Sequence, residues 1–477
     1  MTNKERLAIE PQAMPEQDPL ARARNMEEVA LGYTAEMAQK EASRCLNCPA
    51  RPCVEGCPVK IRIPDFLAAA AKGDFAGALA IVRESSLLPA VCGRVCPQER
   101  QCQKYCTVGK LFKDVSKAVA IGRVERFVAD SAAAAEAPRP AAAKEGRRVA
   151  VVGSGPAGIT CAADCARAGC RVTMFEAFHR AGGVLVYGIP EFRLPKRIVE
   201  REIDGLRAMG VEVVTDFVVG KTASLEDLRR EFDAVFVGTG AGLPKFMGIE
   251  GEELIGVFSA NEYLTRANLM KAYREDRAAT PYWHGRRVAV LGGGNVAMDA
   301  ARMALRLGAE EVNLIYRRSR AEMPARAEEV HHAQEEGVKF HLLANARRIL
   351  GDADSRVTAV ECLRYELGEP DASGRRSPVA IAGSEYRLAA DTVIVAVGSG
   401  SNPLLAATTP GLKVDARGHI VVDERTMMTS LPGVFAGGDI VLGAATVILA
   451  MGEGRRAAAG IADYLANTAS GGHQAKG

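Results

Sequence analysis

The sequence predicts an α/β protein in which two βαβ units follow a small helical domain rich in cysteine. Residues 148–176 and 287–318 each read as a buried strand, a glycine-rich turn, a helix and a second strand. Eight of the twelve cysteines lie between Cys45 and Cys106, ahead of both units. Further apolar, β-branched strands follow the second unit, so we expect one domain to be inserted into the other.

Composition limits the classes of function. Of the 477 residues, 48% are apolar and 25% are charged, as in ordinary globular proteins, and this length suggests about three domains. A formal net charge of +3 favours neither a nucleic-acid nor a membrane partner. No apolar run has the length of a membrane span, and the first residues are too polar for a secretory signal. We therefore expect a cytoplasmic protein.

Residues 1–130 are expected to form the helical domain. Residues 1–40 are polar and predict a loosely ordered arm that leads into a short helix at 36–44. Apolar residues at helical spacing predict helices between 63 and 88. Two cysteine quartets flank these helices. The quartets are Cys45, Cys48, Cys53 and Cys57, and Cys92, Cys96, Cys102 and Cys106.

Closely spaced thiols in turns interrupted by Pro and Gly favour iron–sulfur clusters. Disulfides would require an oxidising compartment, and zinc sites usually show paired C-x2-C spacing. The Cys-Pro that ends the first quartet is similar to the bacterial ferredoxin run, in which the fourth cysteine serves the other cluster. By that logic we expect two [4Fe-4S] clusters. One would use Cys45, Cys48, Cys53 and Cys106, and the other would use Cys57, Cys96, Cys102 and either Cys92 or Glu125.

A linker at 131–146, rich in Ala and Pro, separates the helical domain from the first βαβ unit. The turn of this unit has the G-x-G-x-x-G pattern of dinucleotide-binding domains. Such a turn lets the backbone approach a pyrophosphate at the helix N-terminus, and an acid at the end of the second strand can accept hydrogen bonds from the ribose hydroxyls. The residues expected to bind this nucleotide are Gly153, Gly155, Pro156, Ala157, Gly158 and the terminal acid Glu176.

The second unit has the variant turn G-x-G-x-x-A and ends on two arginines. A carboxylate at that position would repel a 2′-phosphate, whereas guanidinium groups bind it, so we expect NADP(H) rather than NAD(H). The alternative is a solvated basic strand end. The residues expected at this site are Gly292, Gly294, Asn295, Val296, Ala297, Arg317 and Arg318.

The remaining segments predict two nested Rossmann-like domains. The loop at 181–195, with its glycine hinges, is expected to run beside a flat ring system. Near the C-terminus, Gly438 lets the backbone approach a cofactor, and Asp439 could accept hydrogen bonds from a polyol chain. The helix that begins near Ala445 would point its positive end at a developing anion. We expect an FAD domain at 147–255 and 401–468, an NADPH domain at 256–400 inserted into it, and a disordered tail at 469–477.

Two further groups of residues are expected to be structural. His331 and His332 are adjacent on a charged helix and face different sides of it, so we expect them at the surface rather than at a metal. Cys161 and Cys165 lie one turn apart on the first nucleotide helix and are expected to pack as small apolar residues. No C-x-x-C follows residue 48, which argues against a disulfide reductase.

Motifs spread over residues 25–465 make the chain similar to one family. They include CLNCPARPCVEGCP, GGVLVYGIPEFRLPK, LGGGNVAMDAAR and GVFAGGDIVLGAATVILAMGEGR. The chain resembles the small (beta) subunit of NADPH-dependent glutamate synthase and its relatives. Those relatives are the large subunit of NADH-dependent ferredoxin:NADP oxidoreductase, sulfide dehydrogenase flavoproteins and the N-terminal half of dihydropyrimidine dehydrogenase. The resemblance implies a carboxylate or amide cluster ligand at Glu125, and it adds to the FAD site Gly183, Leu185, Arg193, Asp439 and Thr446.

The resemblance also implies that NADPH delivers hydride to FAD and that single electrons pass through the clusters to a partner. No acid–base residue is expected, because the cofactors carry the chemistry. Glutamate synthesis needs a glutaminase domain and an FMN barrel, for which the three expected domains leave no room, so we expect a large glutamate synthase subunit as partner. The alternative partner is a ferredoxin-type electron-transfer subunit, which would make the chain the large subunit of a ferredoxin:NADP oxidoreductase, or a sulfide dehydrogenase. A third hypothesis is a non-catalytic relay module, and the sequence is compatible with a homo-oligomer.

Overall fold

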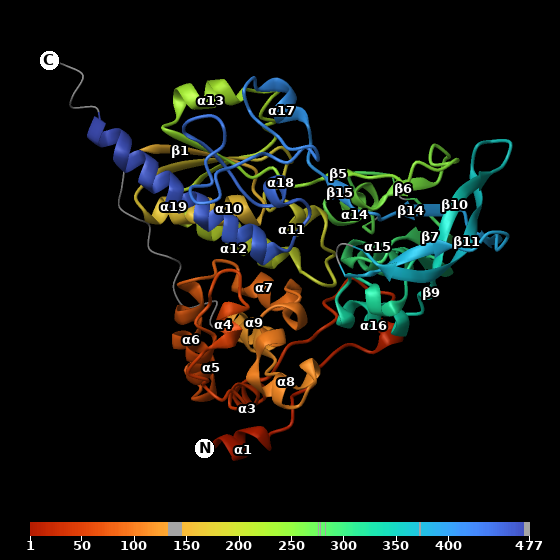
Figure 1. Ribbon diagram of the computed structural model, residues 1–477, viewed down its shortest axis with the longest axis horizontal. Helices are drawn as coiled ribbons and strands as arrows, with labels where there is room; N and C mark the ends of the chain where they lie inside the picture. The colour runs from red at the N-terminus through yellow and green to blue at the C-terminus, as the bar shows by residue number, and fades with distance from the viewer. Residues whose placement is uncertain (132–145, 275, 277, 282, 372–373, 472–477) are drawn as a thin grey trace.

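Two parallel sheets of five strands each form the two larger domains of the protein (Figure 1). The structure is a computed structural model and describes residues 1–131, 146–274, 276, 278–281, 283–371 and 374–471. The first sheet has the strand order β16-β4-β1-β2-β3, and we call its domain the first domain. Its strands are β1 (Arg148–Val152), β2 (Arg171–Phe175), β3 (Glu212–Val214), β4 (Ala234–Val237) and β16 (Val434–Ala436). Because β16 pairs in parallel with β4, the C-terminal part of the chain completes the sheet that the first βαβ unit begins.

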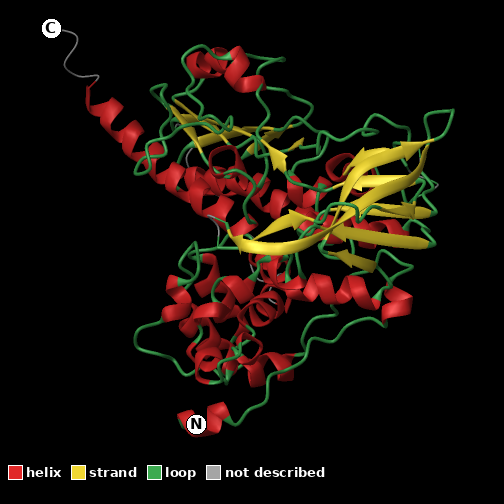
Figure 2. Ribbon diagram, turned by 45° about the vertical axis from the view of Figure 1, so that its right-hand side comes forward, coloured by secondary structure: helices red, strands yellow, loops and turns green. Residues whose placement is uncertain are grey.

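The second sheet has the order β6-β14-β7-β8-β9 and organises the second domain. Its strands are β6 (Val257–Ser259), β7 (Arg287–Leu291), β8 (Glu311–Tyr316), β9 (Lys339–Leu342) and β14 (Thr392–Val395). An antiparallel sheet, which the sequence did not lead us to expect, lies between β9 and β14 in the chain and extends beyond the second domain (Figure 2). Its strands are β10 (Ala344–Gly351), β11 (Val357–Pro370), β12 (Arg376–Ala380) and β13 (Tyr386–Ala389).

The two segments that connect the first and second domains lie side by side. The outgoing strand β5 (Leu243–Pro244) pairs with the returning strand β15 (Ser399–Gly400). The second domain is therefore inserted into the first, as the sequence predicted.

The helices of these two domains cover the faces of the sheets. The two glycine-rich turns lead into α10 (Pro156–Arg167) and α15 (Asn295–Arg306), which confirms both βαβ units. The C-terminal helix α19 (Val447–Gly471) packs along α10, and its last three residues, 469–471, belong to the expected tail. Residues 472–477 lie outside the described residues. The other helices are α11 (Val184–Tyr187), α12 (Lys196–Ala208), α13 (Leu225–Glu231), α14 (Ala260–Asn268), α16 (Ala327–Glu335), α17 (Leu404–Thr408), α18 (Asp439–Leu442) and the 3-10 turn η4 (Arg320–Glu322).

The N-terminal region forms a helical domain below the first domain in Figure 1. Two of its helices, α5 (Ile63–Ala71) and α6 (Phe75–Arg83), confirm the helices expected between 63 and 88. The others are α3 (Ala35–Ala42), α4 (Pro52–Glu55), α7 (Pro89–Val95), α8 (Thr107–Leu111), α9 (Ile121–Ser131), η1 (Gln98–Arg100), η2 (Gln103–Tyr105) and η3 (Val115–Lys117). Most of the expected linker, residues 132–145, lies outside the described residues. No helix of the described part of the chain combines the length and apolar character of a membrane span.

The expectation of a loosely ordered arm was wrong. Residues 1–34 contain α1 (Asn3–Leu7) and α2 (Pro19–Arg22), and they reach the second domain. Arg22 at the end of α2 is buried, and its guanidinium lies 2.6 Å from Glu335 and 3.1 Å from Glu336 of the second domain. A buried guanidinium requires such partners, so the arm is held in place by charge as well as by packing.

Candidate functional site

The turn after β1 leaves open space at the start of α10. Gly153 has a φ of +99°, and a Cβ there would lie 2.5 Å from the carbonyl oxygen of Gly238. Gly158 is equally confined, because a Cβ there would lie 1.9 Å from the carbonyl oxygen of Gly153. At Gly155, by contrast, a Cβ would have no other heavy atom within 4 Å. The open position stands at the positive end of α10, followed by Pro156 and Ala157, and this geometry fits a bound pyrophosphate.

Glu176 lies at the carboxyl end of β2, beside this turn. Its carboxylate is buried and accepts hydrogen bonds from the backbone N–H and hydroxyl of Ser154 and from the N–H of Phe178. The Ser154 hydroxyl oxygen in turn accepts a hydrogen bond from the N–H of Gly182, at 2.8 Å. The acid is therefore held at the sheet edge where a dinucleotide ribose is bound in such folds.

Two later segments come to the same edge of the first sheet. Gly183 has a φ of +53°, and a Cβ there would lie 2.8 Å from the Cα of Gly155, so the loop that continues into buried Leu185 touches the turn. Gly438 makes a similar approach, because its Cβ would lie 2.8 Å from the Cβ of Ala157. Burial raises the pKa of the next residue, Asp439, to about 6.

Thr446 connects the same edge to the helical domain. Its hydroxyl oxygen accepts a hydrogen bond from the side-chain amide of Gln101, at 3.4 Å. The cofactor edge of the first domain and the cysteine region are therefore in direct contact.

One expected residue of this edge lies elsewhere. The side chain of Arg193 is buried against the second domain, where one guanidinium nitrogen contacts both oxygens of Asp299 at 2.7 and 2.8 Å. Its Nε lies 2.9 Å from a carboxylate oxygen of Glu329. These carboxylates hold the pKa of Arg193 above its usual range. Arg193 therefore makes a contact between the two domains, and its expected contact with a cofactor stays a prediction.

Sequence reasoning missed Lys196, which shapes the loop before it. Its buried ammonium donates hydrogen bonds to the backbone carbonyls of Leu185, Ile189 and Leu194. Three carbonyls on one ammonium fold the loop back on itself, which fixes its path beside the turn. The only signal in the sequence was the Pro-Lys that ends the motif GIPEFRLPK.

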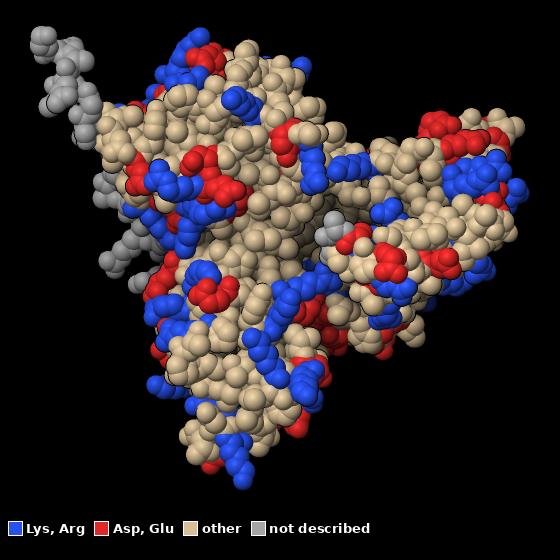
Figure 3. Space-filling view, viewed as in Figure 1, with Lys and Arg blue, Asp and Glu red and all other residues tan. Residues whose placement is uncertain are grey.

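The second glycine-rich turn repeats the geometry of the first. A Cβ at Gly292 would lie 2.4 Å from the carbonyl oxygen of Ala396, and Gly294 precedes α15 with an extended backbone. The Asn295 side chain accepts a hydrogen bond from the N–H of Arg326, at 2.9 Å. Val296 is exposed and Ala297 is buried. The surface is hollowed between the first and second domains, on the side that Figure 3 shows.

The two arginines after β8 differ in their contacts. Arg318 is buried, donates to the carbonyl of Arg376 at 2.8 Å and pairs with Asp371 at 2.6 Å. Arg317 is exposed and forms no hydrogen bond or ion pair with any residue of the described chain. Of these two arginines, Arg317 is therefore the one whose guanidinium has no partner among the described residues and can meet a ligand.

Four thiols surround a small apolar cavity in the helical domain. They are those of Cys45, Cys48, Cys53 and Cys106. Cys45, Cys48 and Cys53 are partly exposed, so this group, which we call the outer thiol group, lies close to the surface. Burial and the neighbouring thiols raise the pKa of Cys53 to about 12. Thiolates crowded in this way need a cation, and the donor set fits a cubane cluster.

A second group, which we call the inner thiol group, is buried. It consists of Cys57, Cys96 and Cys102 with Glu125 beside them. Burial raises the pKa of Glu125 to about 8, and its Oε1 has no hydrogen-bond partner among the described residues. Such an orphaned buried oxygen is costly in a folded protein, and a metal ion would satisfy it.

Cys92 stands on the other side of this group. Its Sγ lies 3.6 Å from Sδ of Met451 in α19 and 4.0 Å from the hydroxyl of Ser86. The Cys92 thiol also hydrogen-bonds to Cys96 of the inner group, whereas Oε1 of Glu125 has no hydrogen-bond partner among the described residues. Through Cys92 the helical domain therefore touches α19, the helix that begins beside Thr446.

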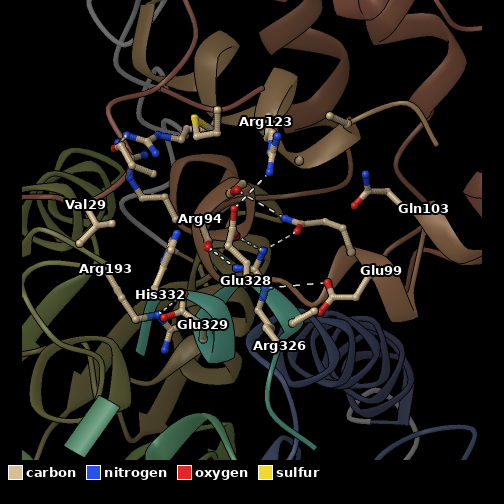
Figure 4. A pocket seen from close by; sticks show the side chains of 18 of the residues that line it. Val29, Arg94, Glu99, Gln103, Arg123, Arg193, Arg326, Glu328, Glu329 and His332 are labelled. Atoms are coloured by element: carbon tan, nitrogen blue, oxygen red, sulfur yellow. Dashed lines mark hydrogen bonds and ion pairs between the residues drawn. The ribbon is translucent and has the colours of Figure 1, made fainter. Parts of the chain in front are cut away.

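A cavity of about 290 Å³ lies where the arm, the helical domain and the second domain meet (Figure 4). Arg123, Arg326 and Glu328 point toward one another from opposite walls, and Glu328 pairs with both guanidiniums at 3.2 and 2.8 Å.

The expectation for His332 was wrong. It is buried and lies 3.0 Å from Glu16 of the arm, whereas its neighbour His331 is exposed, as expected. Glu16, Glu328 and His332 converge, and both acids already have cationic partners, Arg22 for Glu16 and Arg123 and Arg326 for Glu328.

Comparison with known proteins agrees with this architecture. Residues 147–454 match the family model described as pyridine nucleotide-disulphide oxidoreductase. Residues 22–137 match the model described as dihydropyrimidine dehydrogenase domain II, 4Fe-4S cluster. Among solved structures, FprA from Mycobacterium tuberculosis in complex with NADPH has a TM-score of 0.58 at 20% identity, covering 69% of this chain and 86% of that one. This likeness shows the fold of the two nucleotide domains.

Curated relatives extend the similarity to the helical domain. The chain is 41% identical over 439 residues to the β subunit of the NADP(+)-dependent formate dehydrogenase of Moorella thermoacetica, but it spans only 60% of that protein's length. It is 39% identical over 463 residues to the small chain of glutamate synthase [NADPH] from Azospirillum brasilense, covering 95% of this chain and 94% of that one. The chain therefore belongs to the family of pyridine nucleotide-disulphide oxidoreductases with an N-terminal iron–sulfur domain that includes the small chains of NADPH-dependent glutamate synthase.

Proposed function

We propose that the chain is the electron-input subunit of a glutamate synthase, which oxidises NADPH and passes the electrons to a large subunit that forms glutamate from 2-oxoglutarate and glutamine. The observation that carries the proposal is the order of the sites in space. Met451 of the first domain contacts Cys92, whose thiol hydrogen-bonds to Cys96 of the inner thiol group. Thr446 contacts Gln101, the residue before Cys102, and the outer thiol group lies close to the surface. When bound, FAD accepts a hydride and releases single electrons, which iron–sulfur clusters relay.

The first domain would hold the FAD. The open position at Gly155 and the N-terminus of α10 suit the pyrophosphate, and the fixed carboxylate of Glu176 suits the adenosine ribose. Asp439 would accept hydrogen bonds from the ribityl hydroxyls. We assign to this site Gly153, Gly155, Pro156, Ala157, Gly158, Glu176, Gly183, Leu185, Gly438, Asp439 and Thr446.

The second domain would hold the NADPH at the turn Gly292–Ala297. Arg317 is the residue that we assign to the 2′-phosphate, because its guanidinium is exposed and uncommitted. Arg318 would support it by fixing the end of β8 to β11. The task of these side chains is to orient the nicotinamide and to select the phosphorylated cofactor.

We propose one [4Fe-4S] cluster at each thiol group. The outer group supplies Cys45, Cys48, Cys53 and Cys106, and the inner group supplies Cys57, Cys96 and Cys102. For the fourth inner ligand we choose Glu125 over Cys92, because only Glu125 has an orphaned buried oxygen. The twelve cysteines are all free thiols, which fits a reducing compartment, and we place the protein in the cytoplasm.

The first test is anaerobic purification of the tagged protein from its native cells, followed by reduction of the bound flavin with NADPH. Rapid bleaching of the flavin, together with a co-purifying large chain that carries a glutaminase and an FMN barrel, would support the proposal. A smaller partner with its own flavin and a two-iron cluster would replace it with ferredoxin:NADP oxidoreductase. A flavin that NADPH does not reduce would contradict NADPH oxidation itself and favour a non-catalytic relay.

A further inference from the structure

The helical domain exposes a surface for which the proposed function gives no role. We call residues 104–117 the basic-apolar patch. Its large apolar side chains are unusually exposed: Leu111 is 59% exposed, Phe112 49%, Val115 43% and Tyr105 40%. Four such side chains within eleven residues form the kind of surface that usually marks a contact with another molecule.

The charge of the patch is as distinctive as its apolarity. It contains four lysines, Lys104, Lys110, Lys113 and Lys117, against the single acid Asp114. The patch thus carries as much formal charge, +3, as the whole chain. Lys117 lies 3.6 Å from Glu10, and the other three lysines form no ion pair within the described chain. Figure 3 shows Lys and Arg side chains gathered over the region where Figure 1 places α8.

The patch lies directly over the outer thiol group. Cys106 is the residue before α8, and Thr107 and Val108 line the cavity that the four thiols surround. The Thr107 hydroxyl lies 3.1 Å from Sγ of Cys48. A protein seated on the patch would therefore be separated from the outer thiol group only by one short helix.

We propose that the basic-apolar patch is the docking surface for the protein that exchanges electrons with this chain, and that this partner presents an apolar centre within an acidic rim. The proposal rests on the proposed function, in which electrons leave through the outer thiol group. Complementary charge raises the association rate and orients the partner, while the exposed apolar side chains supply the buried centre of the contact. A symmetric contact between two copies of the chain is disfavoured, because it would place the same lysines face to face.

The experiment uses the anaerobic holoenzyme and a defined probe, a small acidic [2Fe-2S] ferredoxin that has been reduced beforehand. The rate at which this probe reduces the bound flavin is measured at increasing salt. For the combined variant Lys104→Glu, Lys110→Glu and Lys113→Glu we expect a rate about tenfold below wild type at low salt, with the difference vanishing at high salt because the charges are screened. For Leu111→Ser with Phe112→Ser we expect a severalfold loss at every salt concentration.

The matched control is Lys413→Glu with Val414→Ser, a lysine and an exposed apolar residue of the first domain. Its rate should equal that of wild type. Equal rates in the patch variants and in the control would overturn the proposal. The proposal would also be overturned if the patch variants mainly lost self-association, or mainly lost binding to anionic vesicles, because the patch would then serve a contact other than the one with an electron-transfer partner. Flavin reduction by NADPH is measured in parallel and should be unchanged in every variant, so a failure there counts against the proposed function and not against the patch.

Discussion

Arg193 and Asp299 form a buried ion pair that joins the first domain to the second. Arg193 follows Phe192, whose ring is packed under the guanidiniums of Arg302 and Arg306 at 4.8 and 3.8 Å from the ring centroid. The loop 181–195 touches the first glycine-rich turn at one end and the second domain at the other. It is therefore placed to fix how the two nucleotide sites face each other.

Replacing Arg193 should destabilise this junction strongly. Arg193→Ala leaves Asp299 and Glu329 buried with one cation fewer, and breaking a buried pair on one side costs about 3–5 kcal/mol. We expect a lower midpoint of urea unfolding and slower flavin reduction by NADPH. The matched control is Arg207→Ala, which removes the exposed pair with Asp204 and should cost less than about 1 kcal/mol. Equal midpoints for the two variants would contradict the junction role.

The inner thiol group predicts different outcomes for its two candidate ligands. Glu125→Ala should lose roughly half of the iron and acid-labile sulfide, because one of the two proposed clusters loses a ligand. Cys92→Ser should keep both, since we assign the fourth ligand to Glu125, and the Cys92 thiol contacts Met451 and Ser86 as well as Cys96. Cys161→Ser, a buried thiol outside both groups, serves as the control. Loss of iron in Cys92→Ser and its retention in Glu125→Ala would reverse our assignment.

Local patterns made much of the fold accessible from the sequence. Each βαβ unit is specified within about thirty residues by strand, turn and helix signals that lie next to one another. The nested connection followed from the late return of buried strands, and β16 pairs beside β4 as that expectation requires. The antiparallel sheet β10–β13 was missed, because its strands are only partly buried and lack the continuous apolar, β-branched runs that mark the parallel strands.

Partners far away in the chain explain which contacts of the site the sequence did not predict. Arg193 meets Asp299 across 106 residues, and His332 meets Glu16 across 316. The neighbouring sequence does not indicate which charged side chain will be buried against Arg193 or His332. Arg317 and Arg318 are adjacent and identical, but they differ in the structure because Asp371 forms an ion pair with Arg318. The sequence around them does not show this difference.

The nucleotide preference should depend on Arg317. Arg317→Ala removes the uncommitted guanidinium, and a charge-assisted hydrogen bond contributes about 1.5–3 kcal/mol, so we expect KM for NADPH to rise roughly tenfold or more. KM for NADH should stay unchanged, because NADH has no 2′-phosphate. Steady-state kinetics with both nucleotides measures the difference, with Arg201→Ala, an exposed arginine of α12, as the control. A parallel rise in both KM values would count against a phosphate contact.

The stability of the protein without bound cofactor should depend on pH through Asp439. Burial raises the pKa of its carboxyl from 3.8 to about 6, with a smaller contribution from the nearby Glu453 carboxylate, while the N–H of Ala445 acts in the opposite direction. An acid with a raised folded-state pKa binds a proton more tightly in the folded state than in the unfolded state. Its contribution to stability is therefore complete below about pH 4 and is lost as the pH rises through about 6.

Asp439→Asn removes this titration. We expect the variant to lack the part of the decline between pH 4 and 6 that Asp439 causes, on the order of 1–3 kcal/mol in the free energy of unfolding, because each pKa unit corresponds to about 1.4 kcal/mol. Denaturant unfolding of the cofactor-free protein across this range measures the effect. Asp415→Asn, whose carboxylate is exposed and has a lowered pKa, is the control and should not flatten the decline. If wild type and Asp439→Asn lose stability in parallel between pH 4 and 6, the buried carboxylate is not the group that titrates there.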